Sequence, residues 1–166
     1  MVTAFLLLGS NLGDREGYLD KARKQIRQEA VTLLKVSSIY ETAAWGTHAQ
    51  PDFLNQVIVI ETKLTAEHLL RTVQQIESSL GRQRSEKWSA RTIDIDILFH
   101  GDQIIETPEL VIPHPAIPRR RFTLIPLAEI IPAFVHPVLN KTIEKLLVEC
   151  NDPLTVNLFK HPDGLL

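Results

Sequence analysis

The stretch from Ile93 to Ile97 alternates strictly between isoleucine and aspartate, and no other segment limits the fold as tightly. Successive side chains of a β-strand point to opposite faces of a sheet. The isoleucines would therefore enter a hydrophobic core, and Asp94 and Asp96 would lie side by side on the other face. The pattern predicts a strand over 93–99 with a pair of carboxylates on one side.

The rest of the chain alternates between strand and helix patterns. Strands are expected over 2–8, 32–40 and 54–62, and helices over 15–29, after Asp14, and between Thr65 and Gly81. Together with 93–99 this gives the order β-α-β-β-α-β. The prediction is an α+β protein with a ferredoxin-like antiparallel sheet and helices packed on one face of it.

The second half of the chain is less regular. After a turn at 100–102, residues 103–105 are expected to pair with the strand over 93–99. A proline-rich extended stretch follows over 108–118, and helices are expected over 122–130 and 141–148. Residues from 151 onward form a tail whose order the pattern does not indicate.

Length, charge and cysteine content narrow the class of protein. A chain of 166 residues suits one domain, and a net charge of −2 argues against a general nucleic-acid binder. The single cysteine, Cys150, excludes an intrachain disulfide, and no apolar run reaches the roughly 20 residues that span a bilayer. We expect a cytoplasmic monomer that binds neither membrane nor nucleic acid.

The two aspartates suggest a metal site. Two nearby carboxylates repel each other unless one takes up a proton or a dication binds, and magnesium prefers carboxylate, water and phosphate oxygens. Basic residues precede the strand at Arg82, Arg84, Lys87 and Arg91, as phosphate chemistry would need. No P-loop motif occurs, and residues 9–13 are expected only to turn the chain. A solvent-facing strand with two charges remains the alternative.

Several separated blocks carry a resemblance to a known enzyme family. They are Leu8-Gly-Ser-Asn-Leu-Gly13, Ser37-Ser-Ile-Tyr-Glu-Thr42, Gln50-Pro-Asp-Phe-Leu-Asn55, Ile76-Glu77 with Gly81-Arg82, Lys87-Trp-Ser-Ala-Arg-Thr-Ile-Asp-Ile-Asp-Ile-Leu98 and Ile112-Pro-His-Pro115. In this order they resemble the 6-hydroxymethyl-7,8-dihydropterin pyrophosphokinases of folate biosynthesis. The resemblance covers the chain almost end to end, and implies a single domain over 1–160 with a short tail over 161–166.

The resemblance implies a reaction and its residues. The family transfers pyrophosphate from ATP to the hydroxymethyl group of a dihydropterin and releases AMP. By resemblance, the catalytic residues are Arg82, Arg91, Asp94 and Asp96, with two magnesium ions on Asp94 and Asp96, and the ATP site includes Gln74, Glu77, Trp88, His114 and Arg120.

The pterin site is expected from ring chemistry as well as from the resemblance. Phe53 and Phe122 could sandwich a flat ring, and the Asn55 amide offers a donor and an acceptor to its edge. Thr42 and the backbone from Ala43 to Trp45 would complete the site. The chain departs from the family pattern at Ala43, at Phe53 and at Ser89-Ala90, which leaves the shape of the loop before Arg91 open.

Two other functions remain possible from the residues alone. One is a non-catalytic ferredoxin-like domain that binds a small ligand or RNA, although an RNA-binding sheet would need exposed aromatic residues and a basic balance. The other is a metal-dependent nucleotidyltransferase, which also uses paired aspartates but attacks the α-phosphorus of the nucleotide.

Overall fold

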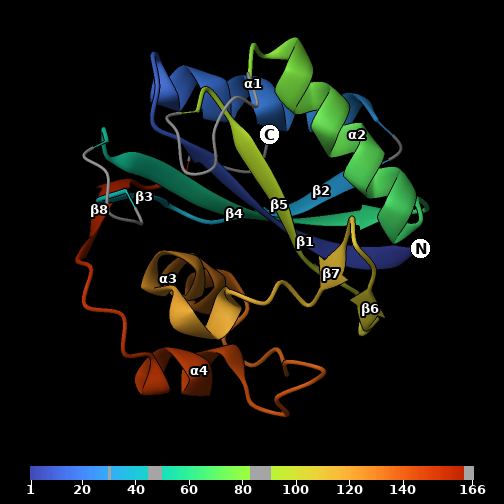
Figure 1. Cartoon of the computed structure of the whole chain (residues 1–166), viewed down its shortest axis with the longest axis vertical. Coiled ribbons are helices and arrows are strands. Elements are labelled where there is room, and N and C mark those ends of the chain that lie inside the picture. The colour runs from blue at the N-terminus through green and yellow to red at the C-terminus, as the bar shows by residue number, and fades with distance from the viewer. Residues whose placement is uncertain (30, 45–49, 83–90, 163–166) are drawn as a thin grey trace.

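The computed structural model describes residues 1–29, 31–44, 50–82 and 91–162. Its main sheet has the strand order β5-β1-β4-β3-β8, with β2 also paired to β4 (Figure 1). The strands are β1 (Val2–Ser10), β2 (Val31–Val36), β3 (Ile39–Thr42), β4 (Phe53–Thr62), β5 (Asp94–His100) and β8 (Val156–Lys160). Every pairing in this sheet is antiparallel. The predicted α+β, ferredoxin-like fold is confirmed.

Local sequence signals start the first two helices. Helix α1 (Arg15–Gln28) begins where the Asp14 side chain accepts a hydrogen bond from the Gly17 N–H. Helix α2 (Ala66–Ser79) begins where the Thr65 hydroxyl accepts one from the His68 N–H. Both caps satisfy backbone donors that the first turn of a helix leaves unpaired. Gly81 follows α2 with a φ of 85°, a conformation that suits glycine after a helix.

Helices cover both faces of the sheet, which corrects the expectation of one covered face. Helices α1 and α2 lie on one side, and α3 (Arg121–Ile130) and α4 (Ile143–Glu149) lie on the other (Figure 1). Leu6 and Leu8 join the first core, whereas Phe5 and Leu7 join the second. A run of apolar residues without alternation belongs to a strand that is buried on both faces.

The expected strand over 32–40 is two strands. It breaks at Ser37 and Ser38, whose buried side chains bond to residues far away in the sequence. The Ser37 hydroxyl accepts from the Val57 N–H at 2.9 Å, and the Ser38 hydroxyl donates to Glu129 at 2.6 Å. The break lets β3 continue along β4 toward Thr42.

One prediction about the second half is wrong. Residues 103–105 do not pair with β5, although the His100 ring bonds to the Gln103 side chain at 2.8 Å across the turn. Instead β6 (Ile105–Glu106) pairs with β7 (Val111–Ile112) as a separate small sheet. The sequence left the order of the tail open, and in the structure its residues 156–160 form β8, which extends the main sheet by pairing with β3.

A short 3-10 turn, η1 (Ile117–Arg119), leads into α3, which contains Pro126. In the part of the chain that the structure describes, no helix is both long and apolar enough to cross a bilayer.

Candidate active site

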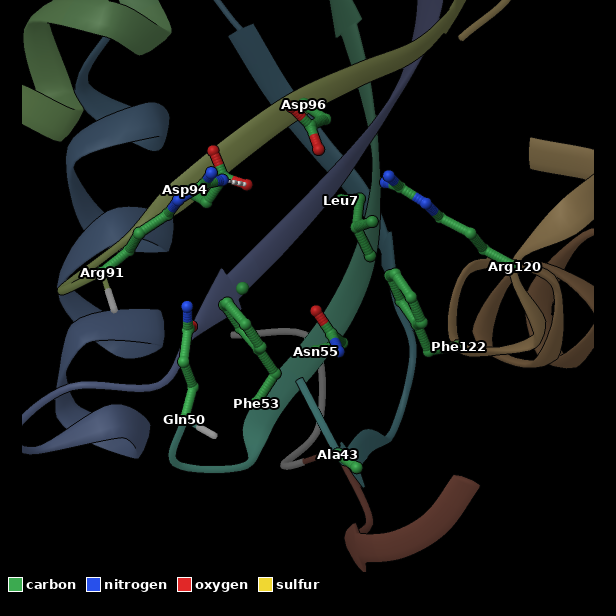
Figure 2. A pocket seen from close by; sticks show the side chains of 11 residues that line it. Leu7, Ala43, Gln50, Phe53, Asn55, Arg91, Asp94, Asp96, Arg120 and Phe122 are labelled. Carbon is green, nitrogen blue, oxygen red and sulfur yellow. Dashed lines mark hydrogen bonds and ion pairs between the residues drawn. The ribbon is translucent and has the colours of Figure 1, made fainter. Parts of the chain in front are cut away.

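A pocket opens between the sheet and the start of α3 (Figure 2). One part of its lining, which we name the charged end, is Arg91, Asp94, Asp96 and Arg120. The other part, the aromatic end, is Ala43, Gln50, Phe53, Asn55 and Phe122, and Leu7 and Gly9 of β1 complete the lining. The pocket thus joins a cluster of charges to a pair of phenylalanine rings.

Strand register brings the two ends together. In the antiparallel ladders, Gly9 lies opposite Asp94 on one side and opposite Asn55 on the other. Leu7 lies opposite Asp96 in the next row of that face. Asp94 and Asp96 therefore share one face of β5, as the alternation predicted, while Ile93, Ile95 and Ile97 enter the first core.

Asp94 is held by two guanidinium groups. Arg82 donates to one of its carboxylate oxygens at 2.8 Å, and Arg91 donates to the other at 2.7 Å. Arg82 also donates to Glu77, which is 2% exposed and accepts a further hydrogen bond from the Ile95 N–H. Because charged partners surround them, the buried carboxylates of this network are compensated by the protein itself.

Asp96 has no directly paired cation among the described residues. Burial, followed by the neighbouring Asp94 carboxylate, raises the pKa of Asp96 to about 8. Figure 2 shows its carboxylate facing the pocket across from the Arg120 side chain, whose charge opposes the rise. Within the described ranges, no hydrogen bond or ion pair to this carboxylate is formed. The unfavourable free energy of this buried negative charge is lowered when the carboxylate takes up a proton or binds a dication.

The donor set fits magnesium. Asp94 and Asp96 offer only oxygen, and no cluster of three or more histidine, cysteine, aspartate or glutamate side chains forms among the described residues. Magnesium commonly takes one or two carboxylates and completes its octahedron with water and substrate phosphates. A metal held here would thus need the substrate's own phosphate oxygens.

His114 lies near the charged end and is held neutral. Burial, followed by the Arg120 charge, lowers the pKa of His114 to about 4. Its Nδ1 accepts from the Ala116 N–H at 3.1 Å, so a proton on the neutral ring belongs to Nε2. The ring can then donate one hydrogen bond from Nε2 without adding charge.

The aromatic end has polar atoms without protein partners. Asn55 is 4% exposed, yet its amide makes no hydrogen bond within the described part of the chain, and in Figure 2 it lies between Phe53 and Phe122. The Thr42 hydroxyl on the adjacent strand is also buried without a partner there. Buried polar groups are normally satisfied, so these atoms indicate a ligand.

The pocket gathers eight of the predicted site residues: Arg91, Asp94, Asp96, Arg120, Ala43, Phe53, Asn55 and Phe122. Arg82 and Glu77 support Asp94 from outside the lining. His114 and Thr42 lie outside the lining too, and Gln74 is exposed on α2. Trp45 and Trp88, with Arg84 and Ser89-Ala90, lie outside the described residues.

Leu7, Gly9 and Gln50 line the pocket and were not predicted. Gly9 belongs to β1, so the expectation that it only turns the chain is wrong. Its position in the lining depends on the register of β1 with β4 and β5, which the local sequence around Gly9 does not reveal. Gly9 and Gln50 both belong to blocks that carry the family resemblance.

Asn11 is a further residue that the sequence did not single out. Its side-chain oxygen accepts from the Arg91 N–H at 2.7 Å, and its amide donates to Gln50 at 3.2 Å and to the Pro51 carbonyl at 3.0 Å. One buried side chain thereby connects a residue of the charged end to one of the aromatic end.

Comparisons with known proteins identify relatives along most of the chain. The 2-amino-4-hydroxy-6-hydroxymethyldihydropteridine pyrophosphokinase of Aquifex aeolicus is 40% identical over 149 residues, which are 90% of this chain and 92% of that one. The protein of the same name from Bacillus subtilis is 50% identical over 128 residues, covering 76% and 77% of the two chains.

A solved structure shares the fold. The crystal structure of Plasmodium falciparum HPPK-DHPS with pteroate matches 89% of this chain with a TM-score of 0.72 and 18% identity, and this chain spans 42% of that one. The family model for 7,8-dihydro-6-hydroxymethylpterin-pyrophosphokinase (HPPK) matches residues 5–132. On this match and these identities, the chain belongs to the 7,8-dihydro-6-hydroxymethylpterin-pyrophosphokinase family.

Proposed function

We propose that this chain transfers pyrophosphate from ATP to the hydroxymethyl group of 6-hydroxymethyl-7,8-dihydropterin in folate biosynthesis, releasing AMP. Family membership supports the reaction. The observation that carries it in this chain is one pocket that joins a carboxylate pair to two phenylalanine rings and a buried amide. The acceptor ring would occupy the aromatic end and the transferred phosphates the charged end.

Each end has a separate task in this proposal. Phe53 and Phe122 would stack on the flat ring, and the Asn55 amide would form hydrogen bonds with the ring's edge. Arg91 and Arg120 would neutralise charge on the phosphates, in a recess where such interactions are stronger than in water. Arg82 and Glu77 would keep Asp94 in place, and the neutral His114 ring would donate to a phosphate oxygen.

Asp94 and Asp96 would hold two magnesium ions. When bound, these ions would neutralise the triphosphate and hold it in line with the acceptor hydroxyl. Both oxygens of Asp94 accept hydrogen bonds from arginines in this structure. We therefore propose that at least one guanidinium leaves Asp94 for a phosphate when the nucleotide binds.

The alternatives have less support. A sheet that binds RNA would expose its aromatic residues, whereas here both phenylalanines are partly buried in a pocket that also contains two aspartates. A nucleotidyltransferase would use the same carboxylates but attack a different phosphorus, so the products distinguish the two reactions.

The test is product analysis. The protein is mixed with ATP, magnesium and 6-hydroxymethyl-7,8-dihydropterin, and the products are separated by chromatography. We expect equal amounts of AMP and pterin diphosphate, and none when EDTA removes the metal. Free pyrophosphate with an adenylated pterin would mean attack at the α-phosphorus and would contradict the proposal.

The assembly and location also stay predictions. A single chain supplies all the residues invoked above, so we propose that a monomer is active, which sedimentation at assay concentration would check. A cytoplasmic location would be checked by cell fractionation.

A further inference from the structure

Gly9 lies inside a regular strand, where glycine is normally unfavourable because it adds backbone freedom to the unfolded chain and no packing. The glycines of positive φ in the described chain are Gly13, Gly81 and Gly101, and Gly9 is not among them. Backbone conformation therefore does not explain a glycine at this position.

Side-chain space does explain it. A Cβ atom built on Gly9 would lie 2.8 Å from the Asn55 Oδ1 and 3.5 Å from the Phe53 Cδ1. The first distance is too short for non-bonded atoms, whereas the second is an ordinary contact. Any side chain at Gly9 would thus push the Asn55 amide out of its present orientation.

Gly9 also lies at the junction of the pocket. Its cross-strand neighbours are Asn55 of the aromatic end and Asp94 of the charged end. An acceptor group that reaches from a ring on the phenylalanines to phosphates at the aspartates would cross the strand here. The absent side chain leaves that path open.

We propose that Gly9 is a specificity-determining, positioning residue: its missing side chain leaves room for the present orientation of the Asn55 amide, and so permits recognition of the edge of the pterin ring. The proposal rests on the proposed function and deepens it. Asn55 touches the substrate, and Gly9 acts through Asn55.

The test compares Gly9→Ala with another substitution on the same strand. We expect Gly9→Ala to raise the KM and Kd for the dihydropterin about tenfold, the factor of one lost hydrogen bond, and to change the KM for ATP less than twofold. Thr3→Ala, on the same strand but outside the lining of the pocket, is the matched control, and both constants should stay unchanged.

A double-mutant cycle separates positioning from general damage. In an Asn55→Ala background the 2.8 Å conflict is absent, so adding Gly9→Ala should weaken pterin binding less than twofold further. An equal loss of pterin binding in both backgrounds would overturn the proposal, as would an equal rise in the KM for ATP.

Stability gives a second measurement if Gly9→Ala folds poorly. The loss of melting temperature in Gly9→Ala should then be recovered in the double variant, because the conflicting oxygen has been removed. Failure to recover would contradict a conflict with Asn55.

Pterin Kd is measured by fluorescence with a non-hydrolysable ATP analogue, so it does not depend on turnover. Wild-type protein that binds the pterin but forms no AMP would refute the proposed function. The double-mutant cycle, measured as pterin Kd, would still decide the role of Gly9. Wild-type protein that does not bind the pterin would overturn both.

Discussion

The two ends of the pocket differ in what the protein provides before a ligand arrives. At the charged end, Arg82 and Arg91 already form ion pairs with Asp94, and Arg82 also pairs with the buried Glu77. At the aromatic end, the Asn55 side chain is 4% exposed and lines the pocket, and the Thr42 hydroxyl beside it is buried without a hydrogen bond in the described chain. The charged end pairs Asp94 internally, although the Nε of its partner Arg82 is also buried without a hydrogen bond there, whereas the aromatic end presents an amide and two rings to a ligand.

This difference predicts different consequences of mutation. Substitutions at the charged end should alter the chemical step, and those at the aromatic end should alter acceptor binding. Asp96 is the exception within the charged end, because its carboxylate has no partner among the described residues and its pKa is raised to about 8. Of the residues at the charged end, Asp96 is the one that a bound cation would stabilise most.

The largest effect is expected for Asp96→Asn. Removing a carboxylate that holds magnesium should lower turnover by on the order of 10³-fold or more, because the charge on the transferred group is no longer compensated. Steady-state turnover measures the loss, and circular dichroism should show an intact fold. Asp102→Asn, an exposed aspartate in the turn after β5, is the control and should keep full activity.

Arg91→Ala should come next. We expect the single-turnover rate to fall by about 10²–10³, with a smaller change in ATP affinity, because the guanidinium stabilises charge that develops during transfer. Rapid-quench measurement of AMP gives the rate. The exposed Arg27 of α1 serves as the matched control, and an unchanged rate in Arg91→Ala would remove this arginine from the mechanism.

Phe122→Ala tests the aromatic end. Losing one stacking ring should weaken pterin binding by about 1–3 kcal/mol and leave nucleotide binding nearly unchanged. Titration with each ligand separately measures both. Phe159→Ala, on β8 away from the pocket, is the control. Equal losses for both ligands in Phe122→Ala would mean that the ring only packs the second core.

The last prediction concerns stability and pH. A raised pKa means that folded Asp96 keeps a proton that the unfolded chain releases above about pH 4. Without metal, wild-type stability should therefore fall as pH rises from about 4 to about 8. Asp96→Asn does not lose stability in this way. Its melting temperature should therefore exceed that of wild type by an amount that grows between about pH 4 and about pH 8. Each kcal/mol of difference in the free energy of unfolding corresponds to roughly 2–4 °C. A difference independent of pH would contradict the pKa assignment.

The two ends also differ in how much of them the sequence could predict. Asp94 and Asp96 belong to one strand, so a five-residue alternation was enough to place them on one face. The helix caps at Asp14 and Thr65 are local for the same reason. The aromatic end depends on the docking of α3 and on the register of β4, so Phe53, Asn55 and Phe122 were brought together by ring chemistry and the family resemblance and not by a local pattern.

Other features escaped prediction for physical reasons. The unbroken apolar run from Phe5 to Leu8 was a sign that β1 is covered on both faces, and the expectation of one covered face ignored it. Gly9 and Asn11 act through contacts with residues 46 and 80 positions away, to Asn55 and Arg91. No local pattern encodes such contacts.

The central claim is that Asp94 and Asp96 hold metal at the charged end. Manganese, used in place of magnesium, can be titrated into the protein with a non-hydrolysable ATP analogue and counted by electron paramagnetic resonance. We predict two tightly bound ions per wild-type chain and the loss of tight binding in Asp96→Asn. Two ions bound with unchanged affinity in Asp96→Asn would contradict the claim.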